Sequence, residues 1–118
     1  MNTSFDSDIP RDDDAKAKLA GLIESARRLS PRMETELVEK AYWTARAAHE
    51  GQRRASGDPY FTHVLAVATI VSELNLGSNA ITAALLHDTV EDTAVSLEMI
   101  RQEFNGTVAL LVDGVSKI

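Results

Sequence analysis

Apolar residues recur three and four positions apart along most of this chain of 118 residues. That spacing places them on one face of an α-helix, and the clearest early run holds Leu19, Leu22, Ile23 and Ala26. No pair of segments shows the strict apolar–polar alternation that indicates neighbouring strands. The sequence therefore predicts an all-α fold: a compact helical domain of about six helices around a core of modest size.

Turn-forming and capping residues divide this apolar pattern into segments. Pro31 suits the first turn of a helix, and Ser78 and Ser96 are good N-cap residues. We expect helices at about 13–29, 31–49, 61–74, 79–88, 97–105 and 106–118. The third is apolar on nearly all sides, which predicts that it is largely buried. Residues 1–12 are acidic and polar and predict a disordered tail, so we assign the folded domain to 13–118.

The composition limits the classes of function. Hydrophobic residues make up 44% and charged residues 25% of the chain, which is ordinary for a globular domain. The absence of cysteine excludes disulfides and thiolate metal ligands. A net charge of −6 argues against direct nucleic-acid binding, and no apolar run approaches the roughly 20 residues of a membrane span. We expect a cytoplasmic protein without a membrane or nucleic-acid partner.

Four polar groups follow the apolar segment that ends at Leu86: His87, Asp88, Glu91 and Asp92. If one helix continues through them, His87 lies over Glu91 and Asp88 over Asp92. Imidazole suits Zn, Fe, Ni and Cu, whereas carboxylate oxygens favour harder ions such as Mn and Mg. A neighbouring imidazole and carboxylate therefore indicate a hydrolytic metal site.

The other two histidines are also placed informatively. His63 lies in the first turn of the predicted third helix, and two neighbouring helices can bring it to His87 and Asp88. Three ligands and an open position suit a catalytic ion, which lowers the pKa of water from about 16 to roughly 7–9. The alternative for a histidine on an apolar helix is a hydrogen-bonded core residue. His49 ends a helix, where an imidazolium complements the helix dipole.

A short basic segment precedes His63. Arg53 and Arg54 stand three and two residues before Ser56-Gly57. Guanidinium groups match phosphate geometry, and serine and glycine add hydroxyl and backbone N–H donors. The segment predicts a phosphate-binding loop, and the alternative is a solvated loop with two exposed charges.

Taken together, these motifs resemble a known family. The similarity covers roughly residues 36–118 and is carried by 48–60, His63, 84–93, Phe104 and 112–117. These segments are similar to the N-terminal hydrolase region of the RelA/SpoT homologues, within the HD superfamily of metal-dependent phosphohydrolases. The resemblance implies an all-helical HD-type domain that removes pyrophosphate from the 3′ position of the alarmone (p)ppGpp. The products are GDP or GTP and pyrophosphate, the reaction belongs to the stringent response, and the usual ion is Mn²⁺.

The resemblance also implies roles for individual residues. By motif match the metal ligands are His63, His87 and Asp88, and Glu91 and Asp92 position or activate the attacking water. Arg54, Ser56 and Tyr60 lie along the nucleotide site, with Arg53 adjacent to them. Two positions depart from the family pattern: Ala55 stands where a basic residue is usual, and Val64 where proline is usual.

In this family the fourth metal ligand is an aspartate well downstream of Lys117. We therefore expect 13–118 to be the N-terminal part of a hydrolase domain, incomplete at its C-terminus and inactive as an isolated fragment. We also expect the fragment to self-associate through an exposed apolar face of its last helix. Two alternatives remain: an HD phosphohydrolase for another nucleotide, and a helical regulatory module without catalytic activity.

Overall fold

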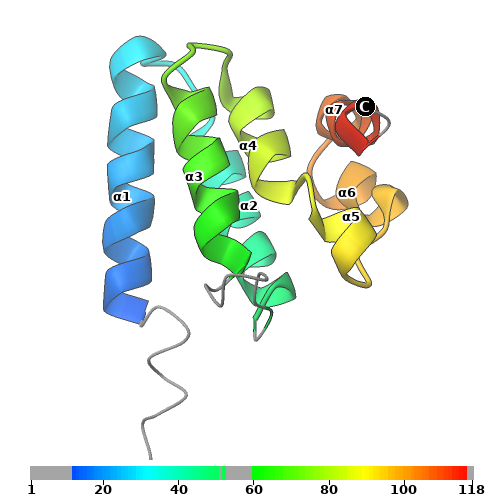
Figure 1. Ribbon diagram of the computed structural model, residues 1–118. Coiled ribbons are helices and arrows are strands. Elements are labelled where there is room, and N and C mark those ends of the chain that lie inside the picture. Colours follow the sequence, from blue (N-terminus) through cyan, green and yellow to red (C-terminus); the bar gives the residue numbers. More distant parts are fainter. Residues whose placement is uncertain (1–11, 51, 53–59, 117–118) are drawn as a thin grey trace, which may run out of the picture.

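The computed structural model describes residues 12–50, 52 and 60–116, and these residues form seven helices and no strand (Figure 1). The predicted all-α fold is confirmed. The helix beyond the predicted six is the single turn α5. The elements are α1 (Asp12–Leu29), α2 (Thr35–Ala48), α3 (Tyr60–Ser72), α4 (Ser78–Leu86), α5 (Thr89–Asp92), α6 (Leu97–Glu103) and α7 (Gly106–Ser116). The predicted disordered tail, 1–12, lies outside the described residues except for Asp12, which begins α1.

The centre of the fold is α4. Its residues 81–86 are all buried, and the helix packs against α2, α3 and α7. In Figure 1 it stands between α3 and α7, with α2 behind it. A short helix can be buried on every side because its own backbone bonds satisfy most of its polar groups. The helix that carries the chain into His87 is therefore held rigidly.

The predicted apolar face of α1 is confirmed, since Leu19, Leu22, Ile23 and Ala26 are buried. A single hydrogen bond reinforces this packing: the hydroxyl of Tyr42 on α2 donates to the carbonyl of Ala15 over 2.8 Å. Burial raises the pKa of Tyr42, a nearby Arg46 lowers it and Asp14 raises it. The aromatic ring of Tyr42 is thus an apolar packing element with a satisfied polar end.

Two predictions, for α2 and α3, were wrong. Helix α2 begins at Thr35 and not at Pro31, because Ser30-Pro31 forms a turn in which the N–H of Met33 donates to Ser30 O over 3.0 Å. Helix α3 is buried along one face only, and Ile70 on the other face is 59% exposed. An apolar composition on all sides does not by itself supply neighbours on all sides, and here α1 and α4 cover only part of the helix.

Side-chain caps begin α6 and α7 but not α4. The predicted cap Ser96 is confirmed, since its Oγ accepts from the N–H of Met99 over 3.2 Å. Ser78 does not cap α4; that position is taken by Gly77, whose φ of 93° lies in the left-handed region that favours glycine. Asn105 caps α7 through Val108 N–H (2.7 Å) and also reaches the side chain of Asn79 over 3.1 Å. This amide pair joins the N-terminal ends of α4 and α7.

No helix in the described ranges has the length and hydropathy needed to cross a bilayer.

Candidate metal centre

The His87-Asp88 pair lies in a break between two helices. The sequence predicted one helix through Asp88, but α4 ends at Leu86 and α5 begins at Thr89. Two carbonyls of the last turn of α4 are taken by side chains: the Nδ1–H of His87 donates to Ala84 O over 2.6 Å, and the hydroxyl of Thr89 donates to Leu86 O over 2.7 Å. Carbonyls at a helix end lack intrahelical partners, and these two side chains supply them as the chain turns. The predicted stacking along one continuous helix was therefore wrong.

The structure brings three of the predicted metal ligands together. His63, in the first turn of α3, lies beside His87, and their ring centroids are 6.1 Å apart. One ligand atom from each of His63, His87 and Asp88 can be chosen so that all three lie within 4.8 Å of one another. Because α3 packs along α4, residues 24 positions apart in the sequence meet at the point where α4 ends.

The hydrogen bonding of His87 determines which ring nitrogen faces the centre. A carbonyl oxygen only accepts, so Nδ1 carries the proton in its bond to Ala84 O. In the neutral ring the lone pair is then on Nε2, which lies 3.1 Å from Oδ2 of Asp88. Two acceptors at that distance attract each other only when a proton or a cation lies between them. A backbone carbonyl that orients the imidazole in this way is a usual accessory of metal-binding histidines.

The three residues fit a divalent ion. Ligand atoms held about 2.1 Å from one ion lie roughly 3 to 3.5 Å from each other, and the His87–Asp88 distance of 3.1 Å matches this spacing. The side chains of His87 and Asp88 are 15% and 19% exposed, so they are shielded but reachable by water. Two imidazoles and one carboxylate form a mixed nitrogen and oxygen donor set, which suits Mn²⁺ as well as Fe²⁺ or Zn²⁺.

The other predicted site residues are less fully described. Glu91 is exposed on α5, one turn beyond the ligands. Asp92 ends α5 and Tyr60 begins α3, but their side chains lie outside the described part of the chain, as do Arg53, Arg54 and Ser56. Their predicted roles therefore stay predictions.

His49 follows the last residue of α2, as predicted, but it is also buried. Only 2% of its surface is exposed, and Nδ1 lies 3.2 Å from the side-chain oxygen of Gln52. Its position at the C-cap places it at the negative end of the helix dipole. Sequence reasoning missed its burial because a histidine at a helix end is usually solvated.

Sequence reasoning also missed two threonines around the ligands. Thr89 is fully buried next to Asp88, and its carbonyl accepts from the hydroxyl of Thr93 over 2.6 Å. The only sequence signal was their spacing of four, which places the hydroxyl of Thr93 where it can bond the carbonyl of Thr89.

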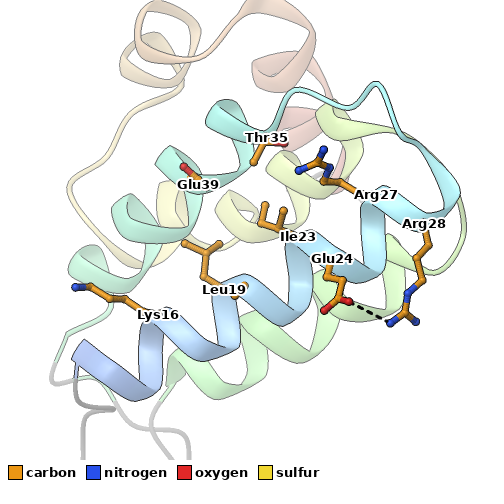
Figure 2. Close-up of a pocket in the computed structure, with 9 residues that line it drawn as sticks. Lys16, Leu19, Ile23, Glu24, Arg27, Arg28, Thr35 and Glu39 are labelled. Atoms are coloured by element: carbon orange, nitrogen blue, oxygen red, sulfur yellow. Dashed lines mark ion pairs between the residues drawn. The ribbon is translucent and has the colours of Figure 1, made fainter.

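One hollow on the described surface adjoins the ligands. A cavity of about 350 Å³ between α3, α4 and α7 is lined by apolar side chains and by His87. A larger hollow, about 620 Å³, lies between α1 and α2 (Figure 2). Its floor is Leu19 and Ile23, and on its rim Glu24 pairs with Arg28 at 3.6 Å. It contains none of the predicted ligands, so we assign the chemistry to the point where His63, His87 and Asp88 converge.

Comparison with known protein families agrees with the geometry. The family model described as "HD domain" matches residues 41–118, which include all three ligands. The chain belongs to the HD domain family, as an HD domain of the RelA/SpoT type.

Three curated relatives illustrate this likeness. The chain is 48% identical over 103 residues to a "GTP pyrophosphokinase" of Streptomyces coelicolor, over 85% of this chain and 12% of the relative. It is 55% identical over 74 residues to the "Guanosine-3′,5′-bis(diphosphate) 3′-pyrophosphohydrolase" of Haemophilus influenzae, over 63% and 11%. It is 48% identical over 88 residues to the "Bifunctional (p)ppGpp synthase/hydrolase SpoT" of Escherichia coli, over 75% and 12%. The chain thus spans about an eighth of the length of the curated relatives it matches.

Proposed function

We propose that this chain forms part of a metal-dependent hydrolase domain that releases pyrophosphate from the 3′ position of (p)ppGpp in the stringent response. The observation that carries the proposal is the convergence of His63, His87 and Asp88, from two helices, to within 4.8 Å. Two of the relatives described above are named for hydrolysis of this nucleotide. A cytoplasmic location and Mn²⁺ as the ion belong to the same proposal.

The chemistry divides among the residues. Mn²⁺, held by His63, His87 and Asp88, would supply Lewis-acid chemistry, which lowers the pKa of water and polarises a phosphoryl oxygen. Glu91 and Asp92 are proposed to orient the attacking water and accept its proton, since their carboxylates follow the ligands by one helical turn. Arg53, Arg54, Ser56 and Tyr60 are proposed to bind the nucleotide, because guanidinium and hydroxyl donors suit a polyanion.

Hydrolysis suits this site better than the synthetic activity that other relatives' names state. The name "GTP pyrophosphokinase" states a pyrophosphate transfer that involves GTP, whereas the converging ligands form one small ion site of the kind that activates water. An HD phosphohydrolase for a different nucleotide remains the second candidate. A substrate panel that sets ordinary nucleoside phosphates against ppGpp separates the two, and a preference for the former would overturn the alarmone assignment.

A graft into a relative tests the activity directly. Residues 41–118 replace the matching segment of the Escherichia coli bifunctional relative, and pyrophosphate released from ppGpp is measured with Mn²⁺ present. We expect the graft to hydrolyse ppGpp, and His87→Ala or Asp88→Asn to reduce the rate by more than about 100-fold. The matched control is Glu73→Gln, which neutralises an exposed carboxylate beyond the end of α3. Full activity in either ligand variant would refute the site.

A further inference from the structure

We infer that Thr89 is a positioning residue for the metal site: its hydroxyl holds open the helix break that presents Asp88 to His63. The inference rests on the proposed metal site. Thr89 contributes no ligand of its own. It acts through the backbone, and the geometry around it shows how.

The first contact of Thr89 ends α4. Its side chain is fully buried and donates to Leu86 O over 2.7 Å. In a continuing helix, Leu86 O would accept a backbone N–H from Val90 four residues on. Here the threonine hydroxyl occupies that carbonyl while His87 occupies Ala84 O. The chain can then turn between the two helices without leaving these buried carbonyls unsatisfied.

The second set of contacts begins α5 and reaches beyond it. The carbonyl of Thr89 accepts from both the N–H (3.0 Å) and the hydroxyl (2.6 Å) of Thr93. The hydroxyl of Thr93 in turn accepts from Val95 N–H over 3.1 Å. These bonds form a string from the end of α4, through α5, to the segment before α6. Asp88 and Glu91 both lie within the segment that these bonds span.

Replacement of the hydroxyl by a methyl group isolates this role. Valine keeps nearly the volume of threonine, so the core stays filled, but Leu86 O loses its donor. A buried carbonyl without a partner recruits a backbone N–H or water, and either change alters the direction in which the chain leaves α4. Metal sites lose about 10- to 100-fold in affinity when the groups that orient their ligands are removed.

The chain offers a matched control in the preceding helix, α4. Thr82 on α4 is also fully buried, but its hydroxyl has no hydrogen-bond partner among the described residues. Thr82→Val makes the same atomic change as Thr89→Val and removes no hydrogen bond that the structure contains. A difference between the two variants therefore reports the role of the Thr89 bond rather than the effect of a methyl group in the core.

The experiment measures Mn²⁺ affinity by electron paramagnetic resonance of the free ion, alongside thermal unfolding without metal. We expect Thr89→Val to bind Mn²⁺ at least about tenfold more weakly than the wild type. We expect Thr89→Ser to restore most of the affinity and Thr82→Val to leave it unchanged. If Thr89→Val does not fold, Thr93→Val removes the second part of the string at a partly exposed residue, and the same loss of affinity is expected.

The results distinguish a failure of the Thr89 role from a failure of the metal site itself. Wild-type affinity in a folded Thr89→Val or Thr93→Val variant, even with a lower melting temperature, would assign the threonines a purely structural role and overturn the inference. The metal site would then stand. Failure of the wild-type chain to bind Mn²⁺ would instead overturn the metal site, and the inference with it.

Discussion

The buried hydroxyl groups of Tyr42 and Thr89 both bond backbone carbonyls, but over very different ranges along the sequence. Tyr42 reaches Ala15, 27 residues away, and joins α2 to α1. Thr89 reaches Leu86, three residues away, and shapes the turn between α4 and α5. The first bond adds to a helix interface that apolar packing already forms. The second lies at the break between α4 and α5, next to the proposed metal ligands His87 and Asp88. A hydrogen bond at an interface thus contributes stability, whereas one at a helix break contributes geometry.

The largest expected effect comes from α4, which leads into the Thr89 turn and packs against α2, the helix that carries Tyr42. Leu85→Ala removes a fully buried side chain from α4 and should lower the free energy of unfolding by about 3 kcal/mol. Chemical denaturation measures the change. Because α4 packs against α2 and α3, both regions should lose protection from hydrogen exchange together. Loss confined to one region would show that the two are separate cooperative units.

The turn between α4 and α5 is tested by replacing His63, the metal ligand that α3 supplies. His63→Gln should weaken Mn²⁺ binding by about 100-fold, because one of three converging donors is lost. The melting temperature of the metal-free chain should change little, since His63 is only partly buried. Titration calorimetry with Mn²⁺ measures the affinity. Undiminished binding would mean that the ion, if bound, sits elsewhere.

The interface region is tested by Tyr42→Phe, which removes the bond to Ala15 O. We expect a loss of about 1 kcal/mol in the free energy of unfolding at neutral pH and no change in Mn²⁺ affinity. The raised pKa of Tyr42 keeps the folded state protonated to a higher pH than the unfolded chain. The unfolded chain therefore releases its proton first, and stability falls as the pH rises above about 10. In the phenylalanine variant this part of the alkaline loss should be absent. An identical alkaline profile would contradict the assignment.

The smallest effect on stability is expected in α7, away from both the Tyr42 bond and the Thr89 turn. Leu110 on α7 is 71% exposed, so Leu110→Glu should change the free energy of unfolding by less than about 0.5 kcal/mol. The predicted self-association through the apolar face of α7 should nevertheless weaken, because Leu110, Leu111 and Val115 are the exposed apolar residues of that helix. Sedimentation at several concentrations measures it. A wild-type chain that stays monomeric at high concentration would remove this prediction.

Much of the fold was predictable because its determinants are local. The buried face of α1 and the Ser96 cap follow from spacing and from the chemistry of short polar side chains. The start of α2 was misplaced because proline suits a turn as well as the first turn of a helix. The exposed face of α3 was missed because burial depends on neighbours that apolar periodicity does not specify.

The same distinction between local and tertiary determinants applies to the candidate site. The sequence by itself determined the donor types, two imidazoles and a carboxylate with acids one turn beyond, because these are properties of single residues and their spacing. Only the tertiary structure decided that α4 stops at Leu86, that His87 directs Nε2 toward Asp88, and that α3 brings His63 to them. The physical reason is that helical periodicity is a local property of the backbone. The meeting of two helices, and the side-chain bonds that end one of them, depend on the packing of the whole domain.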